Sequence, residues 1–230
     1  VGFLLHYAAL HVGGRATGTV PYQNLPGSLS LFAWMLAAAY GVLFLRHREG
    51  STGPFLLPLV IFFMAGSLLL HPTTAHAAPD ALRSGRLFAW HVTLAILGYA
   101  GLTLSFVLAQ MYLLQERQLH TRKLGLLFSR LPALDVLTRL HRTSVKLGVL
   151  ALTVATILGM VRARANWGTA WDAKVAFTLL LIGVYIATLV APRFGVGGKR
   201  LAWTSIAGFV VLMFSYSVVN LFITSEHVFR

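Results

Sequence analysis

Residues 87–114 read LFAWHVTLAILGYAGLTLSFVLAQMYLL and contain no Asp, Glu, Lys or Arg. A helix needs about 20 mostly apolar residues to cross the hydrocarbon core of a bilayer, so this stretch predicts a transmembrane helix. Six further stretches are mostly apolar, and the sequence therefore predicts an all-α, polytopic membrane bundle of about seven transmembrane helices. The six stretches are residues 1–12, 27–45, 54–70, 144–161, 175–191 and 201–224.

The composition supports the same class. The chain is 57% hydrophobic and only 11% charged, which leaves too little polar surface to cover a soluble domain. The chain has 19 Lys and Arg residues and only six Asp and Glu residues. The basic residues lie in short clusters between the apolar stretches. Such clusters fit lipid headgroups better than nucleic acid, so we expect membrane lipid and no nucleic acid as a partner. The absence of cysteine excludes disulfides, Cys-ligated metals and covalent haem attachment through a Cys-x-x-Cys-His motif of this chain.

The basic residues also indicate an orientation. If the N-terminus is cytoplasmic, twelve of the 19 Lys and Arg residues fall in inside segments and seven fall outside. Cytoplasmic loops carry the excess of Lys and Arg, so we expect a multi-pass protein of the bacterial inner (plasma) membrane with its C-terminus external. The first stretch is short for a span, and part of that helix is expected to precede this numbering.

Leucines and basic residues alternate between residues 115 and 143. This pattern predicts an amphipathic helix that lies on the cytoplasmic interface, and the alternative is a plain cytoplasmic helical hairpin. The remaining chain shows no segment long enough to fold alone in water. We therefore expect one integral membrane domain over residues 1–230.

With this topology the outer side collects histidine, aromatic and basic side chains. His91 lies one turn inside the fourth helix, His227 follows the last helix, and Trp167, Trp171 and Asp172 lie in an expected external loop over residues 162–174. A flat, dianionic macrocycle with a central metal needs imidazole ligands, aromatic rings against its faces and cations near its propionates. The residue types fit such a ligand.

Each of these residues also has an ordinary interpretation. A tryptophan near a helix end is commonly part of the interfacial aromatic belt. The imidazole of His91 can snorkel towards the interface, and His227 can be a plain tail residue. Asp172 can simply stabilise a helix N-terminus.

Four motifs in order resemble a known family. Trp90-His91-Val92 with Tyr99 and Ser105-Phe106 is similar to the His-bearing helix of the cytochrome c assembly protein family, whose members include CcsA, CcmC and HemX-like haem-handling membrane proteins. Residues 167–174 resemble its tryptophan-rich signature, and residues 219–227 resemble its Val-Asn segment with a histidine seven positions later. Residues 20–34 resemble its N-terminal Pro, Asn and Ala-Trp segment, so the resemblance covers essentially the whole chain.

The resemblance implies a function. Members of this family hold haem b non-covalently at the external face between two histidines beside the tryptophan-rich loop, and pass it to an apocytochrome or another acceptor. The matching residues here are His91 and His227 as ligands of the haem iron, with the tryptophan-rich loop against the macrocycle. His6 and His71 are candidates for a second haem site. The role implied is that of a haem transporter or chaperone, with a second membrane subunit as a further partner, more than that of a stand-alone enzyme.

The chain departs from the family pattern in ways that favour an alternative. The signature loop is two residues shorter than usual, and Ala173 stands where a proline is expected. These departures resemble the HemX-like branch, which implies a regulatory or scaffold membrane subunit linked to tetrapyrrole metabolism that binds a partner protein and little or no haem. A third interpretation, a b-type electron-transfer cytochrome, needs paired histidines at matching depths, and His6 and His91 do not obviously provide them.

Overall fold

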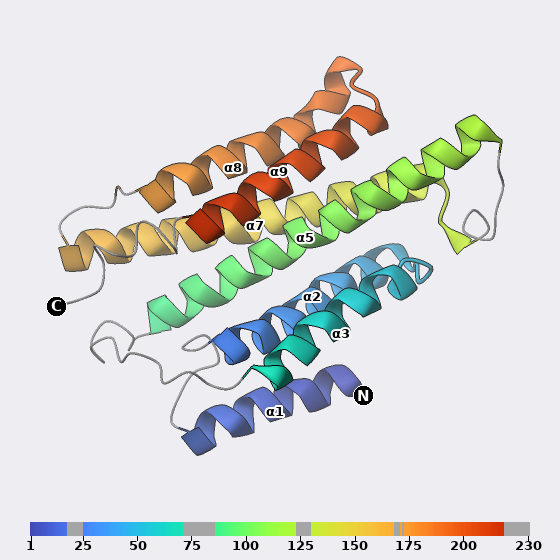
Figure 1. The fold of residues 1–230 in the computed structure, drawn as a ribbon. Helices are drawn as coiled ribbons and strands as arrows, with labels where there is room; N and C mark the ends of the chain where they lie inside the picture. Colours follow the sequence, from blue (N-terminus) through green and yellow to red (C-terminus); the bar gives the residue numbers. More distant parts are fainter. Residues whose placement is uncertain (18–24, 71–85, 123–129, 168–170, 172, 219–230) are drawn as a thin grey trace. The chain divides into compact units, whose positions relative to one another are not determined.

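The computed structural model describes residues 1–230 except 18–24, 71–85, 123–129, 168–170, 172 and 219–230 (Figure 1). The described residues contain helices and no strand, which confirms the all-α class. Each predicted apolar stretch lies largely within one of the α-helices. The elements are α1 (Gly2–Thr17), α2 (Leu25–His47), α3 (Gly53–Leu69), α5 (Arg86–Thr121), α7 (Leu134–Trp167), α8 (Ala173–Val190), the 3-10 helix η2 (Ala191–Phe194) and α9 (Gly198–Val218).

Four helical segments in the described part of the chain are long and apolar enough to cross a membrane: Leu25–His47, Leu87–Thr121, Leu134–Ala165 and Val175–Phe194. The segment Gly53–Leu69 is apolar but shorter. The chain is therefore a membrane protein, and the larger total of about seven spans stays a prediction.

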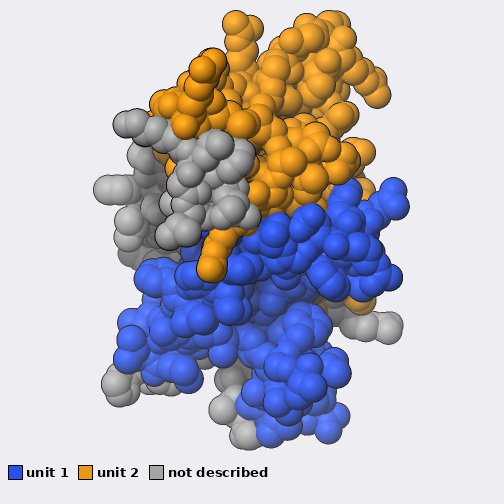
Figure 2. All heavy atoms as spheres, turned by 90° about the vertical axis from the view of Figure 1, so that its right-hand side faces the viewer, with its two compact units in different colours: residues 1–77 blue, residues 78–230 orange. Residues whose placement is uncertain are grey.

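The chain divides into two compact units, residues 1–77 and residues 78–230 (Figure 2). The first unit contains α1, α2 and α3. In it the rings of Phe3 and Trp34 stack with centroids 4.6 Å apart, and the Trp34 Nε1–H donates to the carbonyl oxygen of Phe3 over 3.0 Å. Phe32 meets Phe63 edge to face with centroids 4.7 Å apart. These ring contacts join α2 to each of its neighbours.

The second unit is organised by α5 and α7, which pack closely along one another (Figure 1). Glycines make this approach possible, because a Cβ atom added at Gly101 would lie 2.8 Å from the backbone nitrogen of Gly148. A Cβ atom added at Gly98 would lie 3.0 Å from the backbone nitrogen of Leu152. The pairs 98 with 152 and 101 with 148 fix an antiparallel register. Helices in lipid gain association energy from such backbone proximity.

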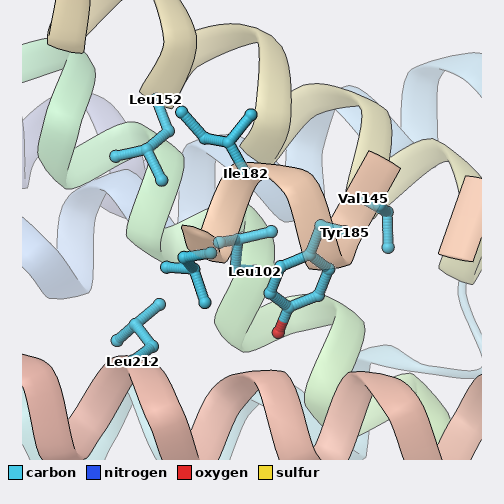
Figure 3. Packing of buried hydrophobic residues seen from close by; sticks show 7 residues of the cluster. Leu102, Val145, Leu152, Ile182, Tyr185 and Leu212 are labelled. Atoms are coloured by element: carbon cyan, nitrogen blue, oxygen red, sulfur yellow. The ribbon is translucent and has the colours of Figure 1, made fainter. Parts of the chain in front are cut away.

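The core of the second unit fills the space where α8 and α9 pack on this pair (Figure 3). The Tyr185 side chain is completely buried, and its ring lies against Gly208, where an added Cβ atom would be 3.0 Å away. Phe106 of α5 stacks on Phe209 of α9 with centroids 4.2 Å apart. The buried residues of this cluster are Leu102, Val145, Leu152, Leu181, Ile182, Tyr185 and Leu212.

Two buried polar contacts converge on Ser205 of α9. Its hydroxyl shares a 2.7 Å hydrogen bond with Nε2 of His141 on α7, and its carbonyl oxygen accepts from the Tyr185 hydroxyl of α8 over 3.2 Å. Buried polar groups need such partners because an unpaired one is costly in an apolar interior. Ser205 thus connects three helices.

The segment 115–143 is described only in part. Residues 115–121 continue α5 and residues 134–143 form the start of α7, while residues 123–129 lie outside the described residues. Arg130 is helical and is separated from α7 by residues 131–133, so the interfacial helix expected between α5 and α7 stays a prediction. On α7, a salt bridge of 2.8 Å joins Arg139 to Asp135 one turn earlier.

Candidate functional site

The His91 side chain projects from α5 onto α7. Its Nδ1 atom lies 2.7 Å from the backbone carbonyl oxygen of Ala155. A carbonyl oxygen can only accept, so Nδ1 carries the hydrogen and the lone pair of the neutral ring is on Nε2. Histidines that ligate metals are commonly oriented by this kind of hydrogen bond from the second ring nitrogen.

A glycine on α7 makes room for the imidazole ring. A Cβ atom added at Gly159 would lie 2.6 Å from Cε1 and 2.8 Å from Nδ1 of His91. Both distances are shorter than the non-bonded contacts that Cβ atoms make in proteins. Ala155 and Gly159 are four residues apart and therefore lie on one face of α7. The ring of His91 therefore lies against α7, between the carbonyl group of Ala155 and the backbone at Gly159, which has no side chain.

Sequence reasoning did not identify Ala155 or Gly159. The signal that could have found them is the spacing of the two small residues, since a small residue, three others and a second small residue mark close helix contacts in membranes. The sequence does not show which helix makes that contact, however. Only the antiparallel register of α5 and α7 places the pair opposite His91.

A cavity of about 260 Å³ adjoins His91 between α5, α7 and α8. Its few polar groups include Thr156, whose hydroxyl donates to the carbonyl oxygen of Leu152 over 2.7 Å. The volume is below the roughly 300–1,000 Å³ typical of small-molecule sites, so the cavity suits the apolar edge of a flat ligand more than a whole one. Its lining residues are His91, Ala95, Tyr99, Leu152, Ala155, Thr156, Gly159, Met160, Ala163, Val175 and Thr178.

An aromatic ring lies beside the imidazole, and a cation lies over that ring. The Phe88 ring is stacked near His91, with centroids 6.4 Å apart and planes inclined by 30°. The guanidinium carbon of Arg162 lies 4.8 Å from the centroid of Phe88, a cation–π distance. The site therefore combines an oriented imidazole, an apolar cavity and a positive charge.

The expected external loop over residues 162–174 is shorter in the structure. Helix α7 continues through residues 162–167, and α8 begins at Ala173. Trp171 lies between these helices with 66% of its surface exposed. Trp171 is therefore a large exposed aromatic side chain at this end of the unit.

Other expected site residues are placed elsewhere or are outside the described part. His6 lies on α1 in the first unit, where its Nε2 shares a 2.9 Å hydrogen bond with the Ser30 hydroxyl. His71, Asp172 and His227 lie outside the described residues, so their roles stay predictions. Among the described residues, no group of three or more His, Cys, Asp or Glu side chains could hold a metal ion.

One buried histidine was not singled out from the sequence. His141 is 7% exposed and bonded to Ser205, as described above. That bond joins α7 to α9. A structural role accounts for it.

Comparisons with known proteins show what the chain is similar to. The sequence model of the family described as "Cytochrome C assembly protein" matches residues 22–227. "Protein HemX" of Brevibacillus brevis is 31% identical over 170 residues, which cover 73% of this chain and 62% of that protein. "Protein HemX" of Bacillus subtilis (strain 168) is 29% identical over 209 residues, with 89% of this chain and 75% of that protein covered.

A relative with a different name is similar to the same extent. The "Cytochrome c biogenesis protein CcsA" of Synechococcus sp. (strain RCC307) is 29% identical over 237 residues, which cover 89% of this chain and 74% of that protein. The chain thus spans less than two thirds of the Brevibacillus relative and about three quarters of the other two. The family match extends over most of the chain and includes His91, whose setting is described above. The chain belongs to the cytochrome c assembly protein family.

Proposed function

We propose that this chain handles haem b, which it holds non-covalently at the external face of a bacterial plasma membrane and passes to an acceptor such as an apocytochrome. The observation that carries the proposal is the orientation of His91. Its Nδ1–H donates to Ala155, and the lone pair of the neutral ring is therefore on Nε2, the atom that would bind iron. The name of the CcsA relative refers to cytochrome c biogenesis and supports the same role.

The residues around His91 fit one edge of this group. In the proposal, His91 and His227 provide the two axial ligands, while the rings of Trp167 and Trp171 pack against the macrocycle. The cavity beside His91 accommodates an apolar edge, and Arg162 supplies a positive charge for a propionate. Asp172 is proposed to fix the segment between α7 and α8, which carries Trp171. Haem itself supplies an iron whose two axial positions accept and release imidazole ligands.

The remaining parts of the proposal concern orientation and a second site. The excess of Lys and Arg on one side supports a cytoplasmic N-terminus and an external C-terminus. His6 and His71 are proposed as a second haem site. A second membrane subunit is proposed as a further partner, as the resemblance to the family implies.

The HemX relatives support a second candidate function. Two of the similar proteins carry this name, and the loop with Ala173 in place of a proline departs from the full signature. In this role the chain is a regulatory or scaffold subunit that holds a partner protein. It then binds little or no haem.

An absorption spectrum separates the two candidates. We expect the full chain, purified in detergent after expression with added haem precursor, to show a Soret band and sharp bands after reduction with dithionite. Titration with iron-free protoporphyrin is the control, because a site built on axial ligation should bind it more weakly than haem. A protein that is purified colourless, and that then binds no added haem or binds haem no more tightly than iron-free protoporphyrin, would contradict the haem-handling proposal and favour the scaffold role.

The Gly159→Ala variant tests how His91 is positioned. The added methyl group must displace the ring, and the hydrogen bond to Ala155 is then lost or bent. Loss of such an orienting contact typically lowers metal affinity by about 10- to 100-fold, and we expect haem dissociation constants to rise by that factor.

A matched control is available on α8. At Gly183 an added Cβ atom has nothing within 4 Å, so Gly183→Ala should leave the haem titration unchanged. Both substitutions also replace a helical glycine by alanine, which favours the helix equally. Equal haem affinities of the two variants would show that Gly159 does not position the ligand.

A further inference from the structure

A groove of about 560 Å³ opens where the last turns of α5 meet the first turns of α9. It lies at the other end of α5 from His91, about 39 Å along the helix axis at 1.5 Å per residue between positions 91 and 117. The groove therefore belongs to neither the candidate haem site nor its surroundings. Its lining residues are Leu113, Leu114, Glu116, Arg117, His120, Lys199 and Trp203.

The groove lies at the edge of the membrane. Along α5 no charged residue occurs from position 87 to position 115, and Glu116 is the first. Along α9, Lys199 and Arg200 are followed by residues 201–218, none of which is charged. An ion pair of 3.3 Å between Lys199 and Glu116 shows that these two boundaries lie at the same depth. Charged side chains stop where the hydrocarbon begins, so the groove lies at the level of the lipid headgroups.

The walls change in polarity along the groove. Three basic side chains, Arg117, His120 and Lys199, face a single acidic one, Glu116. Next to them are exposed apolar side chains, of which Leu114 is 38% and Trp203 57% exposed. Trp203 lies one turn after Lys199, the position at which aromatic side chains mark a membrane interface. The groove thus combines a positive end with an apolar end at the depth of the bilayer surface.

We propose that this groove binds the headgroup of an anionic phospholipid, with its phosphate beside Arg117 and Lys199 and its acyl chains along Leu114 and Trp203. An anionic phospholipid carries a negative charge and apolar chains on one molecule, which matches both ends of the groove. A soluble phosphate compound would satisfy only the basic end. Basic pockets between helices at a membrane surface are suited to such headgroups.

The test measures which lipids the purified full chain retains. Native mass spectrometry of the detergent-solubilised protein, with phosphatidylglycerol or phosphatidylcholine supplied, counts bound lipids directly. We expect the wild type to retain phosphatidylglycerol over phosphatidylcholine. The variant Arg117→Gln/Lys199→Gln should retain phosphatidylglycerol more weakly, by about fivefold for each cation removed.

The chain offers a control with the same change of charge. The variant Arg139→Gln/Arg193→Gln also removes two cations and one exposed ion pair, that of Arg139 with Asp135, but neither residue lines the groove. Its lipid retention should match that of the wild type. If the double groove variant does not fold, Arg117→Gln alone keeps the pair of Lys199 with Glu116 and should show the effect of one cation.

Three outcomes would overturn the proposal. The first is equal loss of phosphatidylglycerol in the groove and control variants, which would indicate a general effect of charge. The second is equal retention of phosphatidylglycerol and phosphatidylcholine by the wild type. The third is displacement of phosphatidylglycerol from the wild type by millimolar inorganic phosphate, which would indicate a site for a free anion.

Discussion

Replacing Gly101 by leucine is expected to prevent α5 and α7 from packing, and to abolish most of the folded protein recovered in detergent. The physical reason is the position of the Cβ atom, which would lie 2.8 Å from the backbone nitrogen and 2.9 Å from Cα of Gly148. Backbone atoms of a helix cannot move aside as a flexible side chain can. The two helices must separate, and the core residues Leu102 and Val145 then lose contacts.

The expected size of this effect is large because it involves the main helix pair. Overpacking usually costs about 1–3 kcal/mol, and we expect Gly101→Leu to reach or exceed the upper end of that range. The measurement is the midpoint of thermal denaturation in detergent together with the monodisperse yield. Gly101→Ala should give an intermediate value, since it adds only the Cβ atom.

Gly183→Leu is the matched control for the glycine series. Gly183 is an exposed helical position on α8 with open space around its Cβ position. Its replacement should change stability by no more than about 0.5 kcal/mol, as is usual for surface positions. If Gly101→Leu were as stable as Gly183→Leu, the close approach of α5 and α7 would be refuted.

The second large effect is expected from His91→Ala. Loss of the proposed ligand should weaken haem binding by at least about 100-fold, beyond the effect of losing an orienting contact alone. The reduced absorption bands should vanish at haem concentrations that saturate the wild type. His11→Ala is the control, because His11 is an exposed histidine of α1 whose ring stacks on Tyr7 with centroids 6.1 Å apart.

Added imidazole distinguishes ligation from a structural role. His91→Ala leaves a space beside Ala155 and Gly159 that a free imidazole can fill, with its N–H donating to the Ala155 carbonyl group. We expect millimolar imidazole to restore the bands in the alanine variant. A variant that binds haem as the wild type does would exclude His91 as a ligand, and loss without rescue would point to a structural role for the ring.

Much of the fold follows from the local pattern of the sequence. The described part of each apolar stretch is largely helical, because the length and hydrophobicity of a stretch are local properties. The helix ends were less predictable. The charges in residues 115–121 and 162–167 predict an interfacial segment and a loop, whereas these residues extend α5 and α7. Charge marks where the hydrocarbon ends, but a helix with internal hydrogen bonds can continue into the polar region.

The candidate site was predictable only in part. His91 was identified because a histidine in an apolar helix is unusual and functional by default. Ala155 and Gly159 were not identified, since their role depends on the register between α5 and α7. That register follows from the contacts of Gly98 and Gly101, and single glycines in a sequence do not show which helix lies opposite them.

The contacts of His91 have a consequence for the kinetics of cargo exchange. The Nδ1–H donor is present whether Nε2 is neutral or protonated, so the bond to Ala155 survives when a proton replaces a metal at Nε2. With haem bound as proposed, the ring would therefore keep the geometry that it has without a ligand, and its ordering would be a cost of folding and not of binding. We accordingly expect haem to bind without a slow phase from rearrangement of His91.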